Sequence, residues 1–237
     1  PITMNDTLAS MRSRLAAGLD YVLFRKGLLA LSAAYAGGFF RTDPKVASPD
    51  IQVHLVMFST DAMGAAFHPF PGFVVSACQL RPESRGFVRI KSADPRTAPA
   101  IQPLYLSAAA DRDAVLRGMK LIRRIMNGDA IRRYVVAERE PGPDCTTDDQ
   151  MLAYVRNTAM TIYHPVGTSR MGRDPDAVVD DRLRVHGIGG LRVIDGSIMP
   201  TLVSGNTNAA VVMIAEKGAD MVLEDAKAKA TGVARAA

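Results

Sequence analysis

The sequence predicts an α+β fold in which mainly antiparallel strands are flanked by helices. Strand-like and helix-like segments are mixed along the 237 residues without regular β-α-β alternation. The hydrophobic content of 48% is enough for a substantial core, and the 22% of charged residues is close to a globular average. The chain has no Gly-x-Gly-x-x-Gly motif followed by a helix, so a nucleotide-binding half is not expected within it.

The first 26 residues predict a helix, for which Asp6 and Thr7 are candidate caps. Its apolar residues recur at nearly helical spacing: Leu8, Met11, Leu15, Leu19 and Val22. Residues 27–50 are small, rich in glycine and then interrupted by proline, which predicts a loop.

Three strands are expected next, at 51–57, 73–80 and 87–91, because these runs are apolar or alternating and are bounded by turn residues. The third strand follows a turn at Arg85-Gly86. Residues 93–103 carry three prolines and predict a loop.

The clearest helix follows Ser107 and ends at Asn127-Gly128, with one apolar stripe along it. A second helix over 147–158 begins at a Thr-Asp-Asp-Gln capping box. The last helix is expected from Asn208 to Asp225, followed by a tail that frays. Its inward residues are predicted to be Val212, Ala215, Ala219 and Val222.

The charge pattern does not favour binding to nucleic acid or to an anionic membrane. The net charge is only +5, and the Arg and Lys residues are scattered. The two cysteines, Cys78 and Cys145, form neither a disulfide framework nor a Cys-x-x-Cys zinc motif. The longest uncharged apolar stretch, 27–40, is shorter than the roughly 20 residues of a membrane helix, and no signal peptide precedes it. We therefore expect a cytoplasmic protein without a transmembrane segment.

The chain begins with Pro1 instead of methionine, so we expect a processed protein or a piece of a longer one.

Of the four histidines, His164 has the most distinctive context. It precedes Pro165, which biases its backbone to an extended conformation, and its ordinary pKa of about 6.5 suits a general base. The residues alone leave catalytic and structural roles equally open. His54, His68 and His186 favour structural roles, and no pair has the helical spacing of metal ligands, so no metal site is expected.

Two further motifs have both a structural and a functional interpretation. Residues 204–208, Ser-Gly-Asn-Thr-Asn, precede the last helix, where Asn or Thr is a good cap. The same helix start would direct free N–H groups and partial positive charge at a ligand, such as a reduced flavin. Asp195-Gly196 follows the short strand-like Val193-Ile194 and is either an ordinary turn or a ligand contact at a strand end.

Taken together and in this order, these motifs resemble the C-terminal region of the glucose–methanol–choline (GMC) family of flavin oxidoreductases, in its choline-dehydrogenase-like bacterial branch. The resemblance covers nearly the whole chain. Its segments are Pro1–Asn5, Leu80–Asp94 (LRPESRGFVRIKSAD), Tyr163–Gly172 (YHPVGTSRMG), Val178–Arg184 (VVDDRLR), Leu191–Pro200 (LRVIDGSIMP) and Ser204–Asp220 (SGNTNAAVVMIAEKGAD).

The resemblance implies a role for each matching residue. His164 matches the base that acts on the substrate hydroxyl, and Asn206 matches the second active-site position, which also borders the cofactor. Asp195 and Gly196 match residues that contact the ribityl and phosphate groups of FAD. The helix start beneath the flavin pyrimidine is matched by Thr207 and Asn208.

The resemblance further implies a substrate-binding domain over 1–160, an active-site segment over 161–225 that returns into the FAD-binding domain, and a tail over 226–237. A C-terminal strand and helix would complete a Rossmann-like FAD domain supplied by an N-terminal portion, in the same or a separate chain. The implied activity is oxidation of a small-molecule alcohol by hydride transfer to flavin N5, with oxygen or another acceptor reoxidising the flavin. A lyase or decarboxylase on the same scaffold, or a non-catalytic binding module, stays open.

Overall fold

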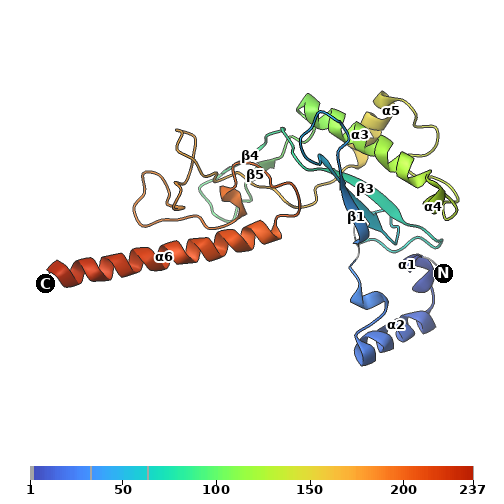
Figure 1. Cartoon of the computed structure of the whole chain (residues 1–237), viewed down its shortest axis with the longest axis horizontal. Helices are drawn as coiled ribbons and strands as arrows, with labels where there is room; N and C mark the ends of the chain where they lie inside the picture. The colour runs from blue at the N-terminus through green and yellow to red at the C-terminus, as the bar shows by residue number, and fades with distance from the viewer. Residues whose placement is uncertain (1–2, 33, 63, 237) are drawn as a thin grey trace. The chain divides into compact units, whose positions relative to one another are not determined.

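The computed structural model describes residues 3–32, 34–62 and 64–236, and side chains of the last helix as far as 228. Figure 1 labels its helices and strands in chain order. The chain divides into two compact units, each formed by two separate stretches. The sheet unit comprises Pro1–Gln79 and Arg112–Val155, and the loop unit comprises Leu80–Asp111 and Arg156–Ala237.

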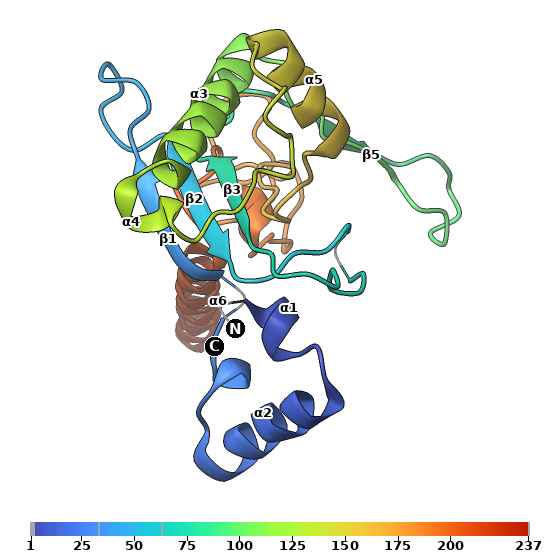
Figure 2. The same ribbon diagram turned by 90° about the vertical axis from the view of Figure 1, so that its right-hand side faces the viewer.

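The sheet unit is built on three antiparallel strands in the order β1-β2-β3: Ala34–Phe40, Ile51–Val56 and Val74–Gln79. The long helix α3, Ala109–Met126, runs across one face of this sheet (Figure 2). The core consists of buried Ile51 and Val53 from β2, packed with Ala114 and Leu121 from α3. The apolar stripe predicted for this helix is therefore the surface that covers the sheet.

Strand β1 corrects the prediction of a loop over 27–50, a range that also contains the 3₁₀ turn η1, Leu28–Ala30. The glycines that suggested a loop serve close strand packing. A Cβ at Gly37 would lie 2.6 Å from the carbonyl oxygen of Val53 on the neighbouring strand. Glycine within a strand commonly has this function, since it lets another backbone approach.

The N-terminal stretch also differs from its prediction, because one expected helix is two: α1, Met4–Thr7, and α2, Met11–Phe24. Ser10 interrupts them and caps α2 by accepting from the Ser13 N–H at 3.1 Å. The large apolar residues of α2 are exposed in this chain: Met11, Leu15, Leu19, Val22, Leu23 and Phe24.

Two shorter helices complete the sheet unit, α4 at Asp129–Arg132 and α5 at Asp148–Thr158. The capping box predicted for α5 is confirmed: Gln150 N donates to Thr147 Oγ1, and Thr147 N donates to Gln150 Oε1.

The loop unit contains one regular antiparallel pair, β4 at Phe87–Arg89 and β5 at Ala100–Gln102. Strand β5 lies in the stretch 93–103 that was predicted to be loop, because it pairs with β4 despite the prolines around it. With both sheets antiparallel, the α+β prediction of mainly antiparallel strands and helices is confirmed.

The core of the loop unit is formed mostly by irregular chain packed on α6, Asn208–Ala236. Its buried residues are Val179, Leu183, Ile198, Met199 and Ile214. Isolated β-bridges, such as those of Val179 with Val185 and of Arg184 with Arg192, join its segments instead of regular strands. The prediction of a short strand at 193–194 is wrong: these residues form no strand and lead into the 3₁₀ turn η2, Gly196–Ile198.

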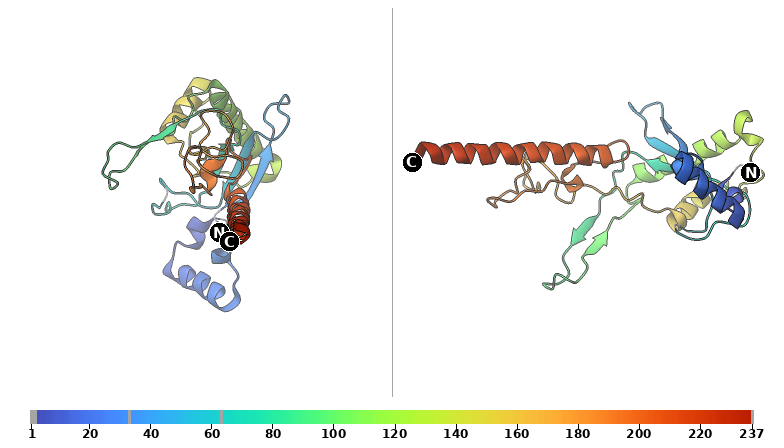
Figure 3. Two further views of the ribbon diagram at one scale, coloured as in Figure 1. Left: turned by 90° about the vertical axis from the view of Figure 1, so that its left-hand side faces the viewer. Right: turned by 90° about the horizontal axis from the view of Figure 1, so that it is seen from below.

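Helix α6 is one continuous element (Figure 3) and extends through the tail that was predicted to fray. Its buried face also differs from the prediction, since Ile214 and Gly218 are buried whereas Val212 and Val222 are exposed. Gly218 allows close packing, because a Cβ there would lie 2.3 Å from Ile194 Cγ2. Among the described helices, none is both long and apolar enough to cross a membrane.

Candidate active site

The backbone around His164 is unusual. Tyr163 has a φ of +61°, in the left-handed region, and its N–H donates to Thr161 Oγ1 at 3.0 Å. Pro165 follows, and Gly167 has a φ of +89°. A left-handed conformation at a bulky residue costs on the order of 1–3 kcal/mol and occurs often at functional sites. This local geometry sets the direction of the half-buried His164 side chain.

The segment after His164 is hydrogen-bonded to the segment after Asp195. Ser169 N donates to Ser197 O at 3.1 Å, and Met171 N donates to Ile198 O at 2.8 Å. Because these two backbone bonds join the motifs directly, the candidate base and the candidate cofactor contact belong to one structural element of the loop unit.

The start of α6 supplies the direct contacts of the histidine ring. Asn206 Nδ2 lies 3.1 Å from His164 Nε2, and Thr207 Oγ1 lies 3.1 Å from His164 Nδ1. Asn206 is exposed, whereas Thr207 is buried with 9% of its surface accessible. Residues 42 and 43 positions apart in the sequence therefore hold both ring nitrogens of one histidine.

The other predicted site residues are Asp195 and Gly196, about ten residues before Asn206, and Asn208, which directly follows Thr207. Asp195 is exposed, and its Oδ1 accepts from Ser197 N at 2.7 Å, so it caps the turn η2 as the structural interpretation expects. Gly196 lies close to α6, since a Cβ there would be 3.3 Å from Val211 Cγ2, a tight contact. Asn208 is the exposed first residue of α6.

An ion-pair cluster fastens α6 to the preceding loop. Asp225 accepts hydrogen bonds from Arg192 and, at 2.9 Å, from Arg182. The bond with Arg192 is the larger cause of a lowered pKa for the Asp225 carboxyl. These contacts stabilise the position of α6, whose first turn holds the histidine. They were not predicted from the sequence, which gives no local signal for pairs more than 30 residues apart.

The remaining histidines contact structural groups. His186 Nε2 is 3.1 Å from Gly172 O, His68 contacts Ser59 and Asp61, and His54 lies within β2. In the described part of the chain, no three His, Cys, Asp or Glu side chains gather closely enough to hold a metal ion.

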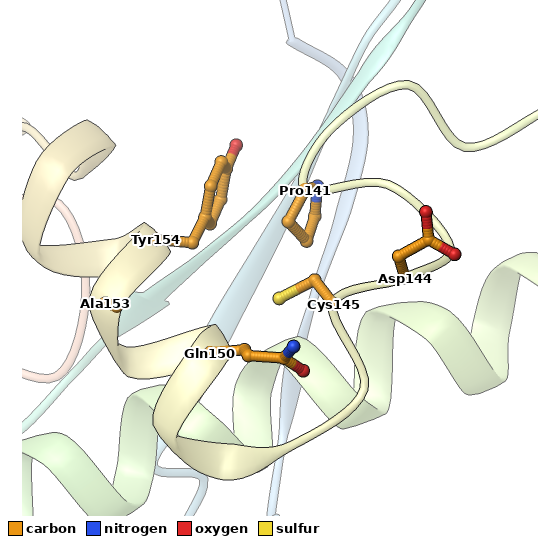
Figure 4. Close-up of a pocket in the computed structure, with 6 residues that line it drawn as sticks. All are labelled: Pro141, Asp144, Cys145, Gln150, Ala153 and Tyr154. Atoms are coloured by element: carbon orange, nitrogen blue, oxygen red, sulfur yellow. The ribbon is translucent and has the colours of Figure 1, made fainter.

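The sheet unit has an open hollow of about 390 Å³ around Cys145. Its lining residues are Pro141, Asp144, Cys145, Gln150, Ala153 and Tyr154. Figure 4 shows the Cys145 sulfur directed between Pro141 and Gln150 toward the face of α5 that carries Tyr154. These residues include neither a histidine nor a lysine, the usual activating partners of a catalytic thiol.

Comparison with known proteins gives a family. A family model described as GMC oxidoreductase matches residues 82–215. The chain belongs to the GMC oxidoreductase family. This confirms the resemblance seen in the sequence motifs, and the FAD predicted from it is the cofactor of this family.

Relatives and solved structures agree with this assignment. An alcohol dehydrogenase (acceptor) of Pseudomonas putida is 41% identical over 204 residues, which are 86% of this chain and 37% of that protein. An oxygen-dependent choline dehydrogenase of Cronobacter sakazakii is 42% identical over 205 residues, with the same coverage. The chain therefore spans little more than a third of the length of these GMC relatives.

Two solved structures share the fold. Pyridoxine 4-oxidase from Mesorbium loti superposes with a TM-score of 0.72 at 32% identity, over 80% of this chain and 38% of that one. A formate oxidase from Aspergillus oryzae, studied for modification of its FAD, gives a TM-score of 0.81 at 25% identity, over 95% and 44%.

Proposed function

We propose that this chain supplies the substrate side of an FAD-dependent enzyme that oxidises an alcohol to an aldehyde or a ketone. The supporting observation is that His164 and Asn206 are in contact, 3.1 Å apart, at the exposed start of α6. A base next to an amide donor is what removal of a hydroxyl proton requires. The names of the relatives, an alcohol dehydrogenase and a choline dehydrogenase, point to the same class of substrate.

In this proposal the two side chains act on one oxygen atom. The substrate hydroxyl takes the place of the contact between Asn206 Nδ2 and His164 Nε2, donating its hydrogen to Nε2 and accepting one from the amide. His164 then removes the hydroxyl proton, while Asn206 stabilises the negative charge that develops on oxygen. FAD, when bound, supplies the hydride acceptor at its N5 atom.

The residues present fit such a cofactor. Helix α6 has 29 residues, and its first turn carries the partial positive charge and free N–H groups of a helix start. We propose that Asn206, Thr207 and Asn208 place this turn beneath the pyrimidine edge of the flavin, which is negatively charged when reduced. The Asp195 carboxylate, engaged by Ser197 N through one oxygen, has a second oxygen for a ribityl hydroxyl, with Gly196 beside it.

We further propose that an N-terminal FAD-binding portion, in the same or a separate chain, completes this site. Helix α6 buries Ile214 on one face and exposes apolar side chains on others, and its first eight residues, 208–215, carry no charge. A helical segment that is apolar on several faces is normally buried on those faces. The exposed residues are Val212, Met213, Val222 and Leu223. Since the curated relatives are almost three times as long as their match to this chain, they contain the length that such a portion needs.

The decisive experiment measures bleaching of the flavin by an alcohol, without oxygen, in the FAD-loaded protein. His164→Ala should slow flavin reduction by about 10²–10⁴-fold, the usual value of a positioned base. Asn206→Ala should slow it by on the order of 10²–10³-fold and leave FAD bound. The matched control is His186→Ala, whose exposed ring contacts only Gly172 O in its own loop among the contacts described, and it should keep the full rate.

Other outcomes would point to other functions. A His164→Ala protein that reduces its flavin at the original rate contradicts the assignment of the base. A flavin that no alcohol bleaches favours a lyase or decarboxylase on this scaffold. If Asn206→Ala protein loses its FAD, the main role of Asn206 is to retain the cofactor.

A further inference from the structure

The hydroxyl of Thr207 has a contact that helix capping does not explain. Its Oγ1 lies 3.1 Å from His164 Nδ1, on the opposite side of the ring from Asn206. The Thr207 backbone is fixed, because its carbonyl accepts the first hydrogen bond of α6 from Val211 N at 2.9 Å. With 9% of the residue accessible, the hydroxyl lies in a rigid and nearly dry position.

The two contacts of the ring together determine where its hydrogen is. The Asn206 amide nitrogen can only donate, so His164 Nε2 must accept from it. A neutral imidazole carries one hydrogen, which is then on Nδ1 and is donated to Thr207 Oγ1. The tautomer with the free lone pair on Nε2 is the one that a base facing the substrate needs.

We propose that Thr207 is a positioning residue that holds His164 in the Nδ1–H tautomer with Nε2 directed at the substrate hydroxyl. This inference rests on the proposed function, in which Nε2 takes the hydroxyl proton: the O–H bond breaks, an Nε2–H bond forms, and the ring becomes a cation. The Nδ1–H bond to Thr207 then becomes charge-assisted and therefore stronger. Thr207 thus stabilises the protonated base more than the neutral one.

The test compares Thr207→Val, which keeps the shape and removes the acceptor, with Thr207→Ser, which keeps the hydroxyl. The control is Thr201→Val, an exposed threonine of the same unit. In protein labelled with ¹⁵N-histidine, the ring signals of His164, identified by their loss in His164→Ala, report the tautomer directly. These signals are measured in an Asn206→Ala background, because the Asn206 amide alone would keep Nε2 an acceptor. We expect Nδ1–H in that background, with Thr207→Ser and with the control substitution, and a shift toward Nε2–H with Thr207→Val.

The rate of flavin reduction provides the second readout. Thr207→Val should lower kcat about 10-fold, the effect of losing one hydrogen bond, with little change in KM and with an altered pH profile. Thr207→Ser should restore both the rate and the profile. A structural role alone would move neither the nitrogen signals nor the pH profile.

Three outcomes would overturn the inference. Unchanged His164 nitrogen signals when Thr207→Val is added to Asn206→Ala mean that the hydroxyl does not set the tautomer. Loss of FAD from Thr207→Val with unchanged signals means that the residue retains the cofactor instead. A Thr207→Ser protein as slow as Thr207→Val excludes the hydroxyl as the active group. If His164→Ala is fully active, the proposed function fails, while the nitrogen signals still decide the role of Thr207.

Discussion

His68 of the sheet unit and His164 of the loop unit each have polar side chains at both ring nitrogens, yet the partners differ in kind. His68 Nδ1 lies 3.0 Å from Ser59 Oγ, and its Nε2 lies 2.8 Å from the carboxylate of Asp61. Its side chain is only 10% exposed. His164 contacts a neutral amide and a neutral hydroxyl at the start of a long helix. Polar contacts at both ring nitrogens therefore do not by themselves distinguish a structural histidine from a candidate base.

The difference lies in what the partners themselves are bound to. Ser59 continues into a buried network: its N–H donates to Asn5 Oδ1, and Asn5 Nδ2 lies within 3.3 Å of Ser59 O, Ser59 Oγ and His68 O. This network ties α1 to the loop that carries His68. His164 has one partner on the exposed side, Asn206, that a substrate can replace. We therefore expect changes around His68 to affect stability and changes around His164 to affect rate.

The largest effect on stability is expected for Asn5→Ala. Asn5 is 5% exposed, and its loss removes the acceptor of the buried Ser59 N–H and the donor to the His68 carbonyl oxygen, whereas the Ser59 carbonyl keeps the His68 N–H at 3.1 Å. We expect the free energy of unfolding to fall by about 2–4 kcal/mol, measured by urea denaturation. Exposed Asn157→Ala in α5 is the control, with an expected change within about 0.5 kcal/mol. Equal effects of the two substitutions would show that the network contributes nothing.

A matched pair of histidine substitutions tests the comparison directly. His68→Ala removes the polar contacts of both ring nitrogens and the stacking on Phe70, whose ring centroid is 4.8 Å away, so it should cost about 1–3 kcal/mol of stability. His164→Ala should change stability by less than about 1 kcal/mol. Both are measured by urea denaturation. A larger loss for His164→Ala would mean that the loop unit depends on its histidine for folding.

The smallest expected effect is the change of stability with pH that arises from Asp61. The hydrogen bond to His68 is the main cause of a lowered pKa at Asp61, below its ordinary value of 3.8. The stability from this contact is thus present above that value and is lost as the pH falls through the lower pKa of the folded protein. The free energies of unfolding of the original protein and of Asp61→Asn should therefore become equal as the pH is lowered. Added salt should reduce the stability difference between the two proteins at neutral pH. A stability difference that persists in strong acid would contradict a role for the Asp61–His68 contact.

Locally encoded elements were predictable from the sequence. Helix α5 follows from its capping box, because Thr147 and Gln150 are three residues apart and contact each other. Strand β1 was missed, because Gly37 is a poor strand former that is required only by the approach of Val53 O. The buried face of α6 was assigned wrongly, since its apolar residues surround the helix and periodicity cannot choose among them.

The sequence pointed to the residues of the candidate site, but not to the contacts between their side chains. The resemblance to a family named His164, Asn206 and Thr207, but it placed Thr207 beneath a cofactor. The contact of Thr207 with His164 spans 43 residues and depends on the packing of α6, so no local pattern indicates it.

Between the two hydrogen-bonded segments 169–171 and 197–198, the chain forms a loop that closes at residues 185–191. Val185 N donates to Leu191 O at 3.0 Å, and a Cβ on Gly187, Gly189 or Gly190 would meet nothing within 4 Å. Each doubling of a flexible loop costs only about 0.6 kcal/mol. Residues inserted at 187–190 should therefore leave the contacts of His164 and the packing of α6 unchanged, so this loop is the place for a fluorescent or affinity label.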